Sequence, residues 1–142
     1  MVRYLVQMAL LLAVAVYAWR RGGWSERVAA ATLVAPAAID RIYHLAVASP
    51  QYRQVDLWHV SLDLAMLAAM VWLAMRAPRV WLLWLASLQL ISALGHFLHV
   101  LELAMPIEVY WLMTIAPSYL QILLLGVGTY RNDRFRADKR RT

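Results

Sequence analysis

The sequence predicts an all-α integral membrane protein, a bundle of five transmembrane helices. Of its 142 residues, 63% are hydrophobic and 15% are charged, whereas soluble domains average roughly 45–50% and 25%. The apolar residues fall into five runs, each close to the about 20 residues that a helix needs to cross a bilayer. The basic residues gather at the ends of these runs, which is the placement that membrane topology requires.

Two further counts exclude whole classes of site and partner. The chain has no cysteine, so it forms neither disulfides nor thiolate metal centres. Its net charge is +6, but the basic placement suits membrane topology, and we expect no nucleic-acid partner. The expected partners are membrane lipids and an apolar small molecule, and the sequence leaves a homo-oligomer or a larger membrane complex open.

Short polar or proline-containing breaks separate the predicted helices, which cover residues 2–19, 27–48, 55–75, 80–104 and 107–129. Ser25 is expected to cap the second helix, Pro50 ends it, and Pro106 suits the first turn of the last one. The first run lacks a small-residue cleavage site, so we expect a retained helix rather than a signal peptide. The sequence therefore predicts one transmembrane domain over residues 1–130 and a fraying, basic cytoplasmic tail over 131–142.

The basic residues also predict an orientation. Eleven of the 14 Lys and Arg residues lie in the turns at 20–27 and 76–79 and after residue 130, and we call this side the basic end. The other three, Arg3, Arg41 and Arg53, lie toward the opposite side. Because Lys and Arg prefer cytoplasmic loops, the N-terminus is predicted outside and the C-terminus in the cytoplasm, in a bacterial inner membrane.

All four histidines fall in the half of the bundle away from the basic end, which we call the histidine end. Five of the eight acidic residues lie there too, namely Asp40, Asp56, Asp63, Glu102 and Glu108. Ionisable groups at membrane depth are costly and normally face the bundle interior. Their clustering predicts a functional site near the extracytoplasmic surface.

A rise of about 1.5 Å per residue sorts these side chains into two layers. The outer layer, about 6–7 Å below the predicted helix ends, has one imidazole from each of three helices: His44, His59 and His99. The inner layer, about 12 Å deep, comprises Asp40, Asp63 and His96. Glu102 lies at the mouth with Asp56 and Glu108.

Three interpretations of these layers stay open. In the first, His44, His59 and His99 bind zinc, copper, iron or nickel, or two of the histidines bind a haem. In the second, acids and bases act without metal on an apolar substrate, and the catalytic residues are Asp63, His96, Asp40 and Glu102. In the third, the same side chains form a structural polar network in an accessory subunit of a larger membrane complex.

The segment 87–102 carries a polar face inside an apolar run. Gln89, Ser92 and His96 lie nearly in line on this face at helical spacing. Such a face needs protein rather than lipid against it. We therefore expect the second, third and fourth helices to contact one another and the fifth to close the histidine end.

Several segments resemble the EXPERA superfamily, whose members are small membrane proteins of four or five helices and include the sterol isomerase called emopamil-binding protein. The similar segments are 39–46, 61–64, 89–102, 110–111 and 116–121. The resemblance implies a sterol- or isoprenoid-like ligand and proton-shuttling isomerase chemistry. Within these segments, the predicted ligand-binding residues are Gln89, Ser92, Trp111, Tyr119 and Gln121. The chain departs from the family at His96, where an acid is expected, and at Ser118 and Gln121, where Asn and Trp are expected.

Overall fold

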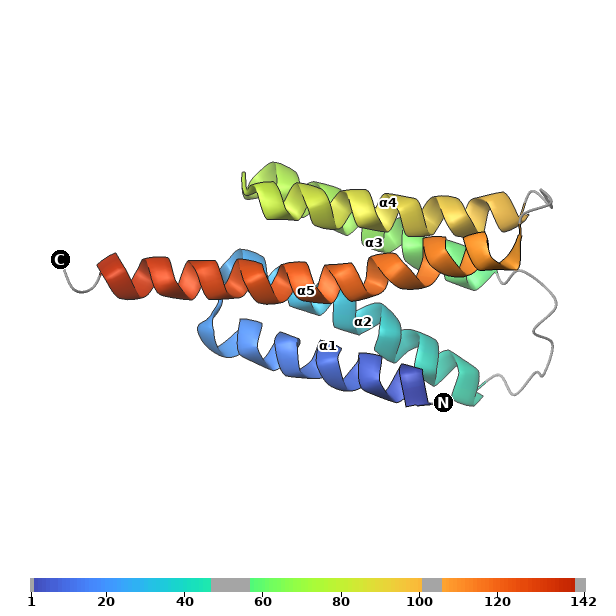
Figure 1. Ribbon diagram of the computed structural model, residues 1–142, viewed down its shortest axis with the longest axis horizontal. Helices are drawn as coiled ribbons and strands as arrows, with labels where there is room; N and C mark the ends of the chain where they lie inside the picture. The colour runs from blue at the N-terminus through green and yellow to red at the C-terminus, as the bar shows by residue number, and fades with distance from the viewer. Residues whose placement is uncertain (1, 47–56, 101–105, 140–142) are drawn as a thin grey trace.

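The computed structural model describes residues 2–46, 57–100 and 106–139, and within these ranges the chain forms five helices and no strand. The helices are α1 (Val2–Arg21), α2 (Trp24–Ala46), α3 (Leu57–Arg76), α4 (Val80–Val100) and α5 (Ile107–Lys139). The predicted all-α class and the five helices are confirmed. The two termini lie at opposite ends of the bundle (Figure 1).

The start of α2 differs from the prediction. Gly23, not Ser25, is the N-cap, and its backbone N–H donates to Oε2 of Glu26 at 2.9 Å. A glutamate at the third helical position that reaches back to the N-cap amide is half of a capping box. Ser25 lies in the first turn, where its hydroxyl donates to the same oxygen at 3.0 Å. The prediction that Ser25 caps the second helix is therefore wrong.

The end of α5 also differs, because the helix continues to Lys139 instead of ending near residue 129. Residues 131–139, predicted to fray, are its last turns. They contain neither glycine nor proline, and arginine, which recurs among them, is a good helix former. No helix-ending signal is therefore present before Lys139.

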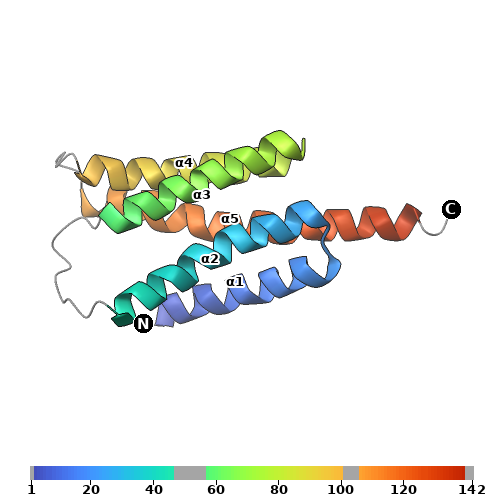
Figure 2. The ribbon, with the colours of Figure 1, turned by 180° about the vertical axis from the view of Figure 1, so that it is seen from behind.

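The helices form a closed ring, in the order α1, α2, α3, α4, α5 and back to α1, and α5 also contacts α2 across it. In both ribbon views α1 and α2 form one pair and α3 and α4 another. α5 runs between the pairs and projects beyond them at its C-terminal end (Figures 1 and 2). The expected contact between the second and fourth helices is wrong for the described residues. The reason is that α5 occupies the space between these two helices.

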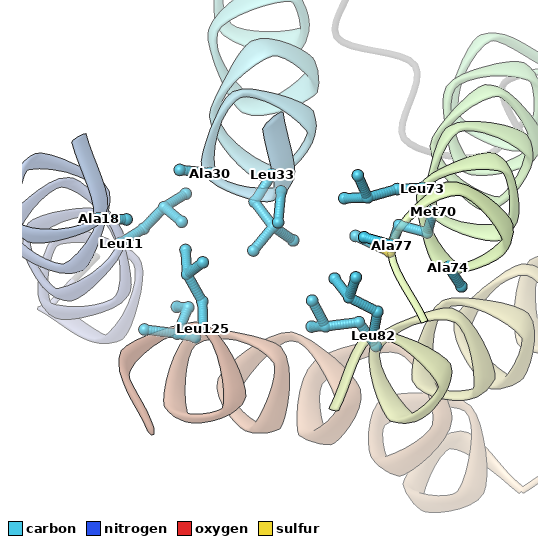
Figure 3. Close-up of a cluster of buried hydrophobic side chains, with 13 residues drawn as sticks. Leu11, Ala18, Ala30, Leu33, Met70, Leu73, Ala74, Ala77, Leu82 and Leu125 are labelled. Atoms are coloured by element: carbon cyan, nitrogen blue, oxygen red, sulfur yellow. The ribbon is translucent and has the colours of Figure 1, made fainter. Parts of the chain in front are cut away.

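The hydrophobic core lies in the half of the bundle toward the basic end. Its buried side chains come from all five helices, and Figure 3 shows them converging between the ribbons. Leu73 of α3 and Leu125 of α5 are fully enclosed, and Ala18, Ala29 and Ala30 keep α1 and α2 close. Dense packing here leaves the open space in the opposite half, where the predicted site residues lie.

Within the part of the chain that the structure describes, three helices are long and apolar enough to cross a membrane, over His59–Arg76, Val80–Leu98 and Glu108–Lys139. Their outward faces carry large apolar side chains, among them Leu83, Trp84, Leu112 and Leu123, each more than half exposed. Exposed apolar surface on this scale is typical of helices that face lipid. These observations support the membrane class that the composition predicts.

Candidate functional site

A cavity of about 270 Å³ lies inside the ring, in the half toward the histidine end. All five helices contribute to its wall. The apolar part of the wall includes Met8, Leu11, Leu33, Pro36 and Met66. The polar part comprises Gln7, Asp63, Gln89, Ser92, His96, Thr114, Ser118 and Gln121. An apolar enclosure with a few convergent polar groups is the usual form of a small-molecule site.

Asp63 and His96 form a pair between α3 and α4 at the edge of this cavity. Nδ1 of His96 lies 2.5 Å from Oδ2 of Asp63. The Asp63 side chain is only 16% exposed and the His96 side chain only 20%. α3 and α4 are antiparallel, so the early part of one lies beside the late part of the other. The predicted proximity of these two residues is confirmed.

Two buried glutamines extend this pair across the bundle. Nε2 of Gln89 donates to Oδ1 of Asp63 at 3.0 Å, and Nε2 of Gln121 donates to Oε1 of Gln89 at 2.9 Å. Gln89 and Gln121 are 2% and 3% exposed. The chain of hydrogen bonds therefore runs from α5 through α4 to α3. The chain holds Oδ1 of the Asp63 carboxylate, and His96 holds Oδ2.

Further polar side chains complete the wall on the side of α1 and α5. Nε2 of Gln7 donates to Oγ of Ser118 at 2.8 Å. The hydroxyl of Thr114 donates to the carbonyl of Tyr110 at 2.9 Å, so its oxygen still has room to accept. The ring of Tyr110 meets the His96 imidazole edge-on, with centroids 5.9 Å apart and planes at 78°. This contact limits rotation of the imidazole.

The arrangement is suited to proton transfer. An ionised carboxylate can only accept, so Nδ1 of His96 carries a proton in this pair. Nε2 is then an acceptor in the neutral ring and a donor in the protonated ring. A carboxylate that holds one ring nitrogen and thereby sets the tautomer and orientation of the other is the device that enzymes use for general acid–base catalysis.

The predicted site residues fall into three groups by their place in the structure. Gln89, Ser92 and Gln121 line the cavity, as the sequence predicts for a binding wall. Tyr119 lines a second, outer groove between α1 and α5 and is not part of the central cavity wall. The remaining predicted residues have side chains outside the described set: Asp40, His44, His99, Glu102 and Trp111.

No group of three or more His, Asp or Glu side chains with metal-binding geometry exists among the residues that the structure describes. Of the proposed triad His44, His59 and His99, only the His59 side chain is described; it is partly buried and does not line the cavity. The described residues therefore do not test the metal and haem interpretation, which stays a prediction.

Two groups of polar residues were not predicted as parts of a site. Gln7 and Ser118 join the cavity wall, and Gln7 carries a signal in the sequence, since it is the one polar residue between positions 5 and 16. Glu26 was overlooked at the basic end, where it is fully buried and pairs with Arg79. A glutamate three residues after a glycine in a turn is a cap signal, but the burial of Glu26 depends on which turns meet at this end.

Comparison of the chain with family models, with curated proteins and with solved structures finds no match. The resemblance to the EXPERA superfamily therefore stays a prediction, and the functional argument rests on the geometry of the cavity.

Proposed function

We propose that this protein binds an apolar, sterol- or isoprenoid-like molecule with a polar end in the central cavity, and that Asp63 and His96 perform acid–base, isomerase-type chemistry on it. The observation that carries this proposal is the 2.5 Å pair of Asp63 and His96 in the wall of a partly open cavity between the helices. The apolar part of the wall suits a lipid-like ligand, and the polar side chains of α1, α3, α4 and α5 suit its polar end.

The chemistry that fits is migration of a carbon–carbon double bond. Protonated His96 donates its Nε2 proton to one alkene carbon, which leaves a carbocation at the neighbouring carbon. A base, neutral His96 or a water beside it, then removes a proton from the adjacent carbon, and the double bond forms one position along. Asp63 stabilises the imidazolium through Nδ1–H throughout, and no net proton is gained or lost.

The proposal includes a membrane arrangement. All five helices span the inner membrane of a bacterium, with the N-terminus outside and the C-terminus in the cytoplasm. The supporting observation is the placement of eleven of the 14 basic residues at one end. In this arrangement the cavity opens toward the extracytoplasmic half of the bilayer, so its ligand is a molecule dissolved in the membrane.

Binding is tested on the full chain in phosphatidylcholine nanodiscs with radiolabelled cholesterol and radiolabelled farnesol as probes. We expect saturable binding of at least one probe. Asp63→Asn and His96→Gln should each weaken it by about tenfold, the scale of a lost charge-assisted hydrogen bond. Asp138→Asn and Asp133→Asn are controls outside the cavity wall and should leave binding unchanged. Non-saturable binding of both probes to the wild-type chain would overturn the proposal.

Chemistry is tested separately in D2O. Isomerisation of an unsaturated sterol or prenol by the proposed route places one solvent deuteron in each product molecule, which mass spectrometry detects. His96→Gln should abolish this uptake, and Asp63→Asn should reduce it by a factor of about 10²–10⁴, the usual contribution of positioned acid–base groups. Saturable binding without deuterium uptake would identify a binding protein rather than an enzyme.

A second candidate is a structural role in a larger membrane complex. The hydrogen bonds from Gln121 through Gln89 to Asp63 favour it, because they link three helices without any ligand. This candidate predicts that Asp63→Asn lowers the free energy of unfolding and that the chain copurifies with other subunits. Elemental analysis and an optical spectrum of the same preparation test the metal and haem interpretation.

A further inference from the structure

A second cavity lies on the outer surface of the bundle, directly beside the first. Its volume is about 350 Å³, and it is lined by apolar side chains and Tyr119 between α1 and α5. Leu10 and Val14 form its α1 wall, and Leu123, Gly126 and Val127 form much of its α5 wall. Leu10, Leu123 and Val127 are about half exposed or more, so this groove faces the surrounding lipid.

The two cavities share one side chain. Ile122 of α5 lines both the inner cavity and the outer groove and is itself 6% exposed. One turn earlier on α5, Ser118 accepts a hydrogen bond from Gln7 of α1 at 2.8 Å. Within the seam between α1 and α5, Ile122 therefore lies between the polar inner cavity and the apolar outer groove, one turn from the Gln7–Ser118 contact.

We infer that the two cavities form a single binding site for an amphiphile with one chain: a lipid alcohol such as a prenol, with its hydroxyl in the inner cavity and its tail in the outer groove. The inference rests on the proposed function and names its ligand class. Rotation of the Ile122 side chain joins the two spaces. The ligand enters from the bilayer through this seam.

The chemistry of the inner cavity selects an uncharged donor as the head group. The Asp63 carboxylate already accepts from His96 and Gln89, and it repels a carboxylate or phosphate head. Acceptors in the wall include the oxygen of Thr114, whose own proton goes to the carbonyl of Tyr110, and the amide oxygens of Gln7 and Gln121, both of which donate through Nε2. A hydroxyl supplies the donor that these acceptors lack.

The chemistry of the outer groove selects the tail. Every residue in its lining except Tyr119 is aliphatic or glycine, and the absence of a side chain at Gly126 widens it. A Cβ placed there meets only Val14, at 3.7 and 3.9 Å, which is ordinary contact. A larger side chain at this position therefore fills the groove, while alanine fits without strain.

The experiment uses the full chain in phosphatidylcholine nanodiscs and two photoreactive probes, hexadecanol with a diazirine near the hydroxyl and hexadecanol with a diazirine near the methyl end. Mass spectrometry maps the labelled residues. We expect the first probe to label inner-cavity residues such as Met66 and Ser92, and the second to label groove residues such as Val14 and Val127. This map needs no variant and does not depend on the folding of any mutant.

Variants then test the groove itself. Gly126→Leu should lower groove labelling by the methyl-end probe about tenfold, because added bulk in a filled site costs on this scale. Gly126→Ala, which fits, should lower it less. Ala68→Leu also introduces a leucine, at an exposed position on α3 that lines neither cavity, and it should change nothing.

The outcomes separate this inference from the function on which it rests. In one outcome, the hydroxyl-end probe labels the inner cavity, but the methyl-end probe labels all lipid-facing helices equally and its labelling is unchanged by Gly126→Leu. The two-part site is then wrong, and ligand binding in the inner cavity stands. If neither probe labels the inner cavity and cholesterol and farnesol do not bind saturably, the proposed function falls as well.

Discussion

The buried carboxylate of Glu26, at the start of α2, pairs with the guanidinium of Arg79 in the turn between α3 and α4. Glu26 is 0% exposed, and the other guanidinium nitrogen of Arg79 lies 3.5 Å from Oδ1 of Asn132 on α5. Three segments far apart in the sequence therefore meet at the basic end. This cluster ties the pair α1 and α2 to the pair α3 and α4.

Arg79→Ala should destabilise the protein strongly, because it leaves the buried Glu26 carboxylate without a positive charge beside it, and only the Gly23 amide and the Ser25 hydroxyl still donate to it. We expect a loss of roughly 3 kcal/mol, at the low end for a broken buried pair since the Arg79 side chain is 38% exposed. Titration with SDS, followed by circular dichroism, measures the free energy of unfolding. Arg76→Ala is the control: Arg76 stacks on the exposed Trp72 ring at 5.7 Å, and its loss should cost well under 1 kcal/mol. Equal losses for the two variants would contradict this role of Glu26.

The glutamine chain predicts a measurable coupling between α4 and α5. Gln89→Leu should cost more than Gln121→Leu, since Gln89 contacts both Asp63 and Gln121. The double variant should recover about 0.6–1 kcal/mol relative to the sum of the single losses, the scale of hydrogen bonds between membrane helices. Ser87→Ala, whose hydroxyl bonds only its own helix, is the control for polar loss on α4. Strict additivity would mean that the two amides do not interact.

Two glycines of α5 should respond oppositely to the same substitution. A Cβ at Gly128 lies 2.8 Å from two ring atoms of Trp81, so Gly128→Ala forces α4 and α5 apart and should cost about 1–3 kcal/mol. At Gly126 the nearest atom is 3.7 Å away, and Gly126→Ala should be neutral or stabilise by up to about 1 kcal/mol. Adding Trp81→Leu to Gly128→Ala should restore part of the loss. The same change in unfolding free energy at both glycines would refute the close approach of Trp81.

The proposed orientation is tested with reporter fusions after Ser49 and after Thr142. With five spans, alkaline phosphatase should be active after Ser49, and a fluorescent protein that folds only in the cytoplasm should fluoresce after Thr142. Neutral substitutions at Arg20, Arg21 and Arg76 should weaken this asymmetry. If both reporters lie on the same side of the membrane, the number of spans between them is even, and the proposed topology is wrong.

The sequence by itself determined the number of helices among the described residues, the starts of α4 and α5, and the common level of Asp63 and His96. Apolar run length and Pro106 are local signals, and helical rise converts position into depth along the axis. This arithmetic was enough to place Asp63 and His96 at one level, where the structure shows them in contact.

Only the tertiary structure decided which helices touch and which way each one faces. Depth along an axis says nothing about rotation around it or about order in the ring. The position of α5 between α2 and α4, the bond from Gln121 to Gln89 and the burial of Glu26 therefore could not be predicted. They follow from the packing of side chains far apart in sequence, which selects one arrangement among many with the same depths.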